Sequence, residues 1–305
     1  MSQSHTTSEF PASGPLTIPM TNDYLFRALL QRNNKVLTGL ISSLLHLSPT
    51  DILSVEITNP IELGKSFNDK SFFLDIKVIL NNNTYLNLEM QVINEGNWPE
   101  RSLSYLCREF DHLSAGEDYK DIKSAIQIGL LNFTLFPDHP EFYSTYRLLN
   151  VKNHTVYSDK LSLSVLDLTQ IHLATQEDKL YHIDYWAALF KAKTWEELHM
   201  LAQKNEYLQE ASETVYKLTQ EEEIRLQCEA REDYYRRMHG IQRKFEQQGA
   251  EFKAVKKEKA ALEKRNAALE RKNASLEQKT AALEKELTAL KQSLAPQTAA
   301  DPPQL

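Results

Sequence analysis

The chain has few of the residues that cross-link a protein and no segment that would span a membrane. Only two cysteines, Cys107 and Cys228, occur among 305 residues, too few for a disulfide framework or a cysteine zinc site. No apolar run approaches the roughly 18 residues that a membrane-spanning helix needs. Residues 1–19 are rich in Ser, Thr and Pro without a signal-like apolar core, which predicts a disordered leader. We therefore expect a cytoplasmic protein without a membrane segment.

Glycine is also scarce, with eight residues, and no Gly-rich phosphate loop stands out. The net charge is −7, unevenly spread: residues 241–305 hold 13 Lys and Arg against 9 Asp and Glu, so the first 240 hold 22 against 33. An acidic domain does not attract phosphate non-specifically. This bulk charge argues against a nucleic-acid ligand, and the objection stays open.

What the chain does contain is a clear alternation of helical and strand-like patterns. We expect helices from Asn22 or Asp23 and over 35–47, strands over 51–58, 71–80, 84–92, 125–136, 142–151 and 161–168, and a helix over 99–115. In that last helix Leu103 and Leu106 are expected to face inward, and Cys107 to be buried. The order predicts an α/β domain over residues 20–175, followed by a helical extension over 176–240.

Two strongly alternating strands carry the polar residues of most interest. In the first, Asp75 and Lys77 share one face, and in the second Glu89 and Gln91 do. A three-residue loop, Asn81–Asn83, pairs apolar with apolar positions and sets Asp75 opposite Glu89. Directly opposed residues have Cβ atoms about 4.5–5.5 Å apart, and two carboxylates that close repel unless a cation lies between them or one is protonated.

This pair suits a divalent ion. Mg²⁺ takes one or two carboxylates together with water and phosphate oxygens, and Lys77 or Gln91 would orient water or neutralise charge. The same four side chains also fit a solvated face of an edge hairpin, because the spacing Asp-x(13)-Glu-x-Gln is degenerate. Spacing leaves both interpretations open.

Longer segments make the chain recognisable. TNDYLFRALL, VEITNP, FLDIKV, LNLEMQ, PERSLSYLCREF, GEDYKDIKSAIQIGLLNF and YWAALFKAKTWEELHMLA occur in this order between roughly residues 20 and 240. Together they resemble the PD-(D/E)XK nuclease family of transposases, also called recombination-promoting nucleases.

The resemblance implies a restriction-endonuclease-like αβββαβ core with a mixed sheet and a DNA substrate. It implies Asp75 and Glu89 as ligands of Mg²⁺ or Mn²⁺, with Gln91 where the family usually has lysine. It further suggests Asp23 as an acidic residue near the metal, and Arg101 and Tyr105 as residues that line the site. The implied activity is metal-dependent DNA endonuclease chemistry linked to recombination or mobile elements.

A different class of function remains as the alternative. A non-catalytic oligomeric interaction protein on a decayed nuclease fold would explain the acidic domain and the missing lysine. Side chains of Asp75 and Glu89 that diverge would favour this alternative.

The C-terminal part carries a heptad repeat. Leucines recur every seven residues from Leu262 to Leu290, in phase with Val255, and no proline intervenes before Pro296. This pattern predicts a coiled coil over 241–295 that forms a parallel homodimer, followed by a disordered tail over 296–305.

Overall fold

The computed structural model describes residues 10–63, 74–113 and 116–293. Contacts within the chain define two compact units, Met1–His239 and Gly240–Leu305, which are described separately. In the described part of the chain, no helix is both long and apolar enough to cross a membrane.

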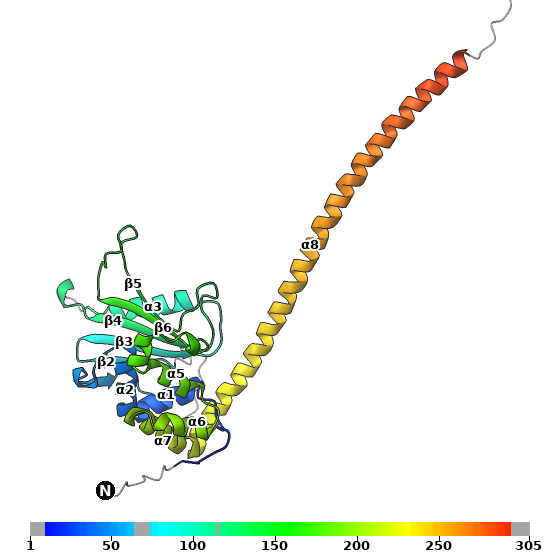
Figure 1. The fold of residues 1–305 in the computed structure, drawn as a ribbon. Helices are drawn as coiled ribbons and strands as arrows, with labels where there is room; N and C mark the ends of the chain where they lie inside the picture. The colour runs from blue at the N-terminus through cyan, green and yellow to red at the C-terminus, as the bar shows by residue number, and fades with distance from the viewer. Residues whose placement is uncertain (1–9, 64–73, 114–115, 294–305) are drawn as a thin grey trace, which may run out of the picture. The chain divides into compact units, whose positions relative to one another are not determined.

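A six-stranded mixed sheet forms the centre of the first unit (Figure 1). Its order is β1-β2-β3-β4-β6-β5. The strand β3 runs antiparallel to β2 and parallel to β4, and β6 runs parallel to β4 and antiparallel to β5. The strands are β1 Val55–Ile57, β2 Ile76–Leu80, β3 Thr84–Gln91, β4 Ser124–Leu131, β5 Tyr143–Arg147 and β6 Leu161–Asp167. The expected α/β class with a mixed sheet is confirmed.

The β2–β3 hairpin has the predicted register. Leu80 pairs with Thr84 and Lys77 pairs with Asn87, and Asn81 and Asn82 adopt the left-handed conformation in the turn. The strand β2 begins later than expected, at Ile76. Of the predicted strand 71–80, residues 71–73 lie outside the described part.

Helices cover both faces of the sheet, and α3 lies on the face opposite the helices that pack around α1 (Figure 1). The main apolar core lies between β2–β4 and this second group. The elements are α1 Asp23–Arg32, α2 Asn34–Leu44, α3 Trp98–Phe110, α4 Gln176–Leu180, α5 Ile183–Lys191, α6 Trp195–Ala202, α7 Glu206–Gln220 and α8 Glu222–Ser293, with short 3-10 turns at Pro49–Asp51, Tyr119–Asp121 and Ile171–Leu173.

The phase of α3 differs from the expectation. Its buried residues are Trp98, Ser102, Leu106 and Glu109, whereas Leu103 is 53% exposed and Cys107 is exposed. The expectation is therefore wrong for Leu103 and Cys107, because the face that meets the sheet includes a serine and a glutamate that an apolar periodicity does not detect.

Asn22 is the N-cap of α1, and its side chain accepts hydrogen bonds from the backbone N–H groups of Tyr24 and Leu25. The same side chain donates to Cys228 O and Glu232 Oε1 at the start of α8. One asparagine thus both begins α1 and fixes the first turns of α8 against it.

Residues 10–19 correct the expected leader of residues 1–19. Phe10 is buried and stacks on His199 of α6 with ring centroids 4.0 Å apart. Leu16 N donates to Lys193 O, and Trp195 N donates to Gly14 O. Aromatic packing and backbone hydrogen bonds therefore order this segment, while residues 1–9 lie outside the described part.

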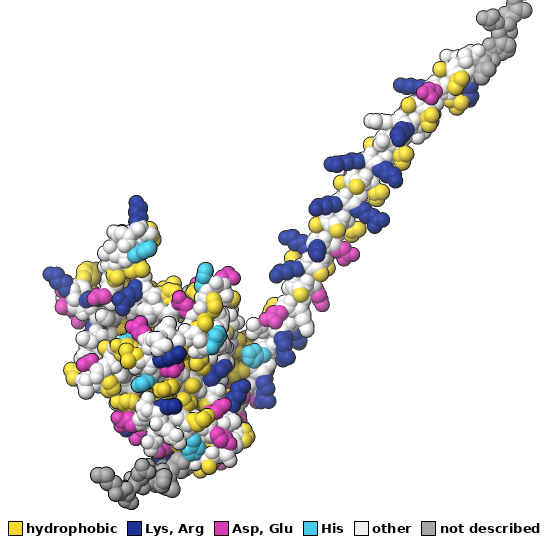
Figure 2. Space-filling view, viewed as in Figure 1, with side chains coloured by type: hydrophobic (Ala, Val, Ile, Leu, Met, Phe, Trp, Pro, Cys, Tyr) yellow, Lys and Arg dark blue, Asp and Glu magenta, His cyan; other side chains and the backbone are white. Residues whose placement is uncertain are grey.

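In the second unit, α8 continues as an uninterrupted helix to Ser293. The heptad leucines lie along it with about half of each side chain exposed, from Leu262 at 51% to Leu290 at 57%. Apolar side chains recur along the helix between Lys and Arg side chains (Figure 2). The expected tail over 296–305 lies outside the described part.

Candidate active site

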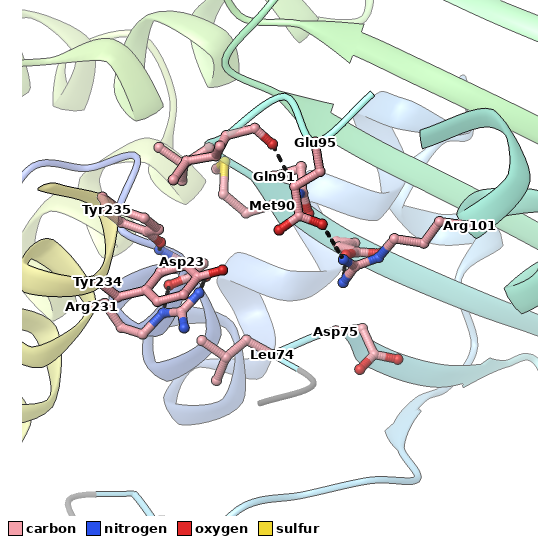
Figure 3. Close-up of a pocket in the computed structure, with 13 residues that line it drawn as sticks. Asp23, Leu74, Asp75, Met90, Gln91, Glu95, Arg101, Arg231, Tyr234 and Tyr235 are labelled. Carbon is pink, nitrogen blue, oxygen red and sulfur yellow. Dashed lines mark hydrogen bonds and ion pairs between the residues drawn. The ribbon is translucent and has the colours of Figure 1, made fainter. Parts of the chain in front are cut away.

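A pocket of about 290 Å³ opens where β3 leaves the sheet. It is lined by α1, the two residues before β2, the end of β3 and the segment after it, α3 and the first turns of α8 (Figure 3). Five residues selected from the sequence line it: Asp23, Asp75, Glu89, Gln91 and Arg101. Lys77 and Tyr105 do not belong to its lining.

Asp75 immediately precedes β2 and is held there through its backbone. Arg27 of α1, which is fully buried, donates to Asp75 O, and Asn59 Nδ2 donates to the same oxygen at 3.0 Å. Asn59 Oδ1 also accepts from Lys77 N at 2.9 Å. This network engages the backbone oxygen of Asp75 and not its carboxylate; Asp75 lines the pocket, and its Oδ1 is buried without a hydrogen-bond partner.

Burial raises the pKa of Asp75, and the nearby charge of Lys77 opposes the rise. Burial likewise lowers the pKa of Arg27 to about 10, and Asp75 opposes that shift. For both groups, burial disfavours the charged form and a nearby opposite charge offsets part of that cost.

Glu89 lies in the interior strand β3, not on a solvated edge. It is 4% exposed and its neighbour on the same face, Asn87, is 1% exposed, because α3 covers this face. Burial raises the pKa of Glu89 to about 7; Arg101 opposes the shift and Asp75 adds to it. Glu89 Oε2 is buried without a hydrogen-bond partner. The solvated-hairpin interpretation is therefore wrong for Glu89.

Arg101 of α3 forms an ion pair with Glu89, with Nη2 2.5 Å from Oε1, and its Nη1 lies 3.8 Å from Glu95 Oε2. Its guanidinium carbon lies 5.6 Å from the centroid of the Tyr105 ring, so Tyr105 lies beside the pocket. Burial raises the pKa of Tyr105, and Arg101 opposes the rise.

Gln91 and Lys77 point to different partners. Gln91 Nε2 donates to Ile93 O at 3.0 Å, which leaves its side chain at the pocket wall. The Lys77 ammonium forms an ion pair with Glu109 of α3. Of the two, Gln91 is the residue that borders the pocket.

Asp23 is engaged by an arginine. Arg231 of α8 donates from Nε to Asp23 Oδ1 at 2.8 Å and from Nη2 to Oδ2. Burial opposes the charge of Arg231, but the hydrogen bonds to Asp23 raise its pKa overall. Tyr234 and Tyr235 of the same helix complete this wall of the pocket (Figure 3).

The oxygen donors of the pocket suit a divalent ion. Asp75 and Glu89 both line this pocket, and each has one buried oxygen without a hydrogen-bond partner; Mg²⁺ needs only one or two carboxylates from the protein. Within residues 10–63, 74–113 and 116–293, no group of three or more His, Cys, Asp or Glu is placed to hold a metal. The residues therefore fit a two-carboxylate site that excludes Asp23.

A family model described as PD-(D/E)XK nuclease family transposase matches residues 20–244. The chain belongs to this family. Neither a curated protein nor a solved structure matches it. The residues that match the family model include the whole mixed sheet, the candidate site and the part of α8 that carries Arg231.

Several pocket residues of this family member could not be found from local patterns. Arg231, Tyr234 and Tyr235 lie more than 200 positions after Asp23, on a helix that the sequence predicts only as an extension. Arg27, which donates to Asp75 O from outside the pocket lining, has no local pattern that links it to Asp75. Glu95 has no periodic context at all.

Proposed function

We propose that this chain is a metal-dependent DNA endonuclease that hydrolyses phosphodiester bonds, with Asp75 and Glu89 as ligands of Mg²⁺ or Mn²⁺. The observation that carries the proposal is the pair of buried carboxylates, each with an unpartnered oxygen, at one pocket. A buried carboxylate oxygen without a hydrogen-bond partner destabilises a fold, and this cost is expected where a cation binds.

When bound, the ion polarises a phosphoryl oxygen and lowers the pKa of a coordinated water. The chain's own residues contribute position and charge. Gln91 borders the pocket with an amide that orients water, and Lys77 supplies positive charge close to Asp75. Arg101 offsets the charge of Glu89 from α3.

DNA is the proposed partner on the strength of the family, whose description joins nuclease and transposase. A role in recombination or with mobile elements follows from the same description. The acidic balance of the first 240 residues implies that attraction to the duplex is local to a few arginines and lysines.

The second proposed partner is another copy of the chain. The half-exposed leucines of α8 lose that exposure when two such helices pair in parallel as a coiled coil. A homodimer brings two catalytic units to one duplex, which suits cleavage of both strands.

Incubation of the purified protein with plasmid DNA in Mg²⁺, Mn²⁺ or Ca²⁺ tests the proposal, with Glu89→Gln as the matched control. We expect nicked and linear products with Mg²⁺ or Mn²⁺ and none from the control. A folded wild-type protein that cleaves in none of these ions would favour the non-catalytic interaction protein.

A further inference from the structure

We infer that Arg231 binds a phosphate group of the DNA in the candidate site and that Asp23 is a positioning residue for its guanidinium rather than a metal ligand. The inference rests on the proposed function and names the residue that meets the substrate.

Three of the four carboxylates that line the pocket, Asp23, Asp75 and Glu89, differ in how their oxygens are engaged. Both oxygens of Asp23 accept hydrogen bonds from Arg231, whereas Asp75 Oδ1 and Glu89 Oε2 have no hydrogen-bond partner. A metal at Asp23 would have to displace a bidentate, charge-assisted pair, which is among the stronger polar contacts in proteins. Asp23 therefore holds the Arg231 guanidinium, and Asp75 and Glu89 are the carboxylates that bind the cation.

The guanidinium of Arg231 is held in a defined orientation. Its carbon lies 4.7 Å from the centroid of the Tyr234 ring and 5.3 Å from that of Tyr235, so cation–π contacts add to the Asp23 pair. Tyr235 Oη accepts from the backbone N–H of Asp23 at 3.3 Å. The Arg231 side chain is 16% exposed, which gives a preorganised cation at the pocket wall with little side-chain entropy left to lose on binding.

The charge balance of the pocket indicates that a bound phosphate needs a positively charged side chain. Its described lining contains four carboxylates and two guanidinium groups, so a divalent ion would bring it to neutrality and a phosphodiester would add one negative charge. Gln91 stands where the family usually has a lysine, and Lys77 is paired with Glu109. A phosphate therefore needs an arginine of the pocket.

Arg231 is better placed for this role than Arg101. Arg101 is shared between Glu89 and Glu95 on one side of the pocket, and Glu89 is a proposed metal ligand. Arg231 and Asp23 form the opposite wall (Figure 3). A phosphate between the walls would meet the cation at Asp75 and Glu89 from one side and Arg231 from the other. Arginine suits this task because its planar fork holds a carboxylate and a phosphate oxygen at once.

The test compares Arg231→Met, Arg231→Lys and Asp23→Asn in the full chain, with Arg236→Met as the matched control. Arg236 is on the same helix, has a side chain 75% exposed and pairs with Asp233, so the control removes the same charge outside the pocket. Binding of a short DNA duplex is measured by fluorescence anisotropy in Ca²⁺ over a series of salt concentrations, and cleavage is measured in Mg²⁺.

Arg231→Met is expected to weaken binding about tenfold or more and to reduce the slope of log K against log salt by about 0.9, the contribution of one phosphate contact. Arg231→Lys keeps the charge, and with it the slope, but cleaves more slowly because the bidentate hold is lost. Arg236→Met is expected to leave the slope unchanged. Wild-type slope in a folded Arg231→Met, or an equal loss in Arg236→Met, would overturn the inference.

Asp23→Asn separates the two roles of Asp23. If Asp23 positions Arg231, the variant should have a lower kcat but the same Mg²⁺ concentration at half-maximal rate. If Asp23 is a metal ligand, the variant should need a higher Mg²⁺ concentration for half-maximal rate, and this result would refute the assignment. The DNA-binding measurement does not depend on cleavage. If the wild-type protein cleaves DNA and Arg231→Met binds DNA as tightly as wild type, the inference about Arg231 is wrong while the proposed function stands. When wild type neither binds nor cleaves DNA, the proposed function fails with it.

Discussion

Arg101 Nη2 on α3 lies 2.5 Å from Glu89 Oε1 on β3, which places an internal cation directly against a buried carboxylate. Even with this partner, burial keeps the pKa of Glu89 at about 7. The arginine therefore offsets only part of the desolvation cost, and the remainder is available to drive cation binding.

The first prediction concerns pH and stability without divalent ions. The folded-state pKa of Glu89 is about 7 and its ordinary value is 4.5, so the folded protein binds the proton more tightly than the unfolded chain. The contribution of Glu89 is complete below pH 4.5 and is lost as pH rises through 7, by about 3 kcal/mol in total. Urea unfolding at pH 5 and pH 8 should show this fall in wild type and a smaller fall in Glu89→Gln. Equal falls in both proteins would show that Glu89 ionises without cost.

The second prediction is that Asp75→Asn and Glu89→Gln each abolish cleavage while the protein stays folded. Each change removes a charge but keeps the size of the side chain, so no cavity forms, and for Glu89 the amide oxygen still accepts from Arg101. Cleavage assays with circular dichroism melts check both halves. Full cleavage by either folded variant would remove that carboxylate from the mechanism.

The hairpin could be predicted because its information is local. A three-residue asparagine loop and period-2 alternation define one register, and Lys77 pairs with Asn87 as expected. The burial of the polar face could not be predicted from the sequence, because it depends on α3 lying over β3. The packing of α3 on the sheet also places the Trp98 ring of α3 against Gly129 of β4, and neither segment alone contains a pattern that predicts this contact.

The partner of Asp23 shows the same limit more strongly. Asp23 was selected through the family resemblance, but Arg231 lies 208 positions away, on a helix that the sequence predicts only as an extension. Phe10 similarly carries no pattern, yet it stacks on His199. Long-range pairs of single residues leave no periodic trace, so they need coordinates.

The third prediction tests Gln91. Gln91→Lys should preserve or raise the rate of cleavage, because it places an ammonium at the pocket wall, where it would stabilise negative charge that develops on the phosphate. Gln91→Leu should lower the rate, since the amide at the pocket wall is lost. Steady-state cleavage rates in Mg²⁺ decide the matter. A leucine variant with the full rate would leave Gln91 without a chemical role and move attention to Lys77.

The fourth prediction uses the contact between α3 and the sheet. A Cβ at Gly129 would lie 2.0 Å from Cζ2 of Trp98, so Gly129→Ala must displace the Trp98 ring, which packs α3 against the sheet. We expect a loss of about 1–3 kcal/mol in the free energy of unfolding and slower cleavage, because α3 carries Arg101. Gly240→Ala, with nothing within 4 Å of the added Cβ, is the control and should stabilise α8 by up to about 1 kcal/mol. Wild-type stability in Gly129→Ala would mean that α3 packs more loosely than the structure shows.

The last prediction is that residues 255–294 form a parallel two-stranded coiled coil. Leucines at d put Arg265, Lys272, Lys279 and Glu286 at g and Glu270, Glu277, Glu284 and Lys291 at e. In a parallel homodimer these four g–e′ pairs are opposite in charge. Exposed pairs contribute only about 0.2–1 kcal/mol each, so they select orientation more than they supply stability.

The seam itself is uneven. Asn266 and Asn273 at a positions cost stability but disfavour other registers, whereas Leu287 and Leu294 make the C-terminal half stronger; Leu294 lies outside the described residues. At the N-terminal end Glu258 at g would face Glu263 at e′, a like-charged pair. The coiled coil should therefore fray toward Val255.

Light scattering on the full chain tests the pairing. The double variant Leu276→Glu, Leu283→Glu should be a monomer, because it places charge in the seam. Its matched control, Ser275→Glu with Ala282→Glu, adds the same charge at c positions and should remain a dimer. Orientation is tested with Leu290→Cys in a Cys107→Ser background, since only a parallel pair brings two d positions of the same number together for oxidation to a disulfide. A wild-type monomer at micromolar concentration would refute the dimer, whereas a dimeric Leu290→Cys variant that forms no disulfide on oxidation would refute only the parallel orientation derived from the charges.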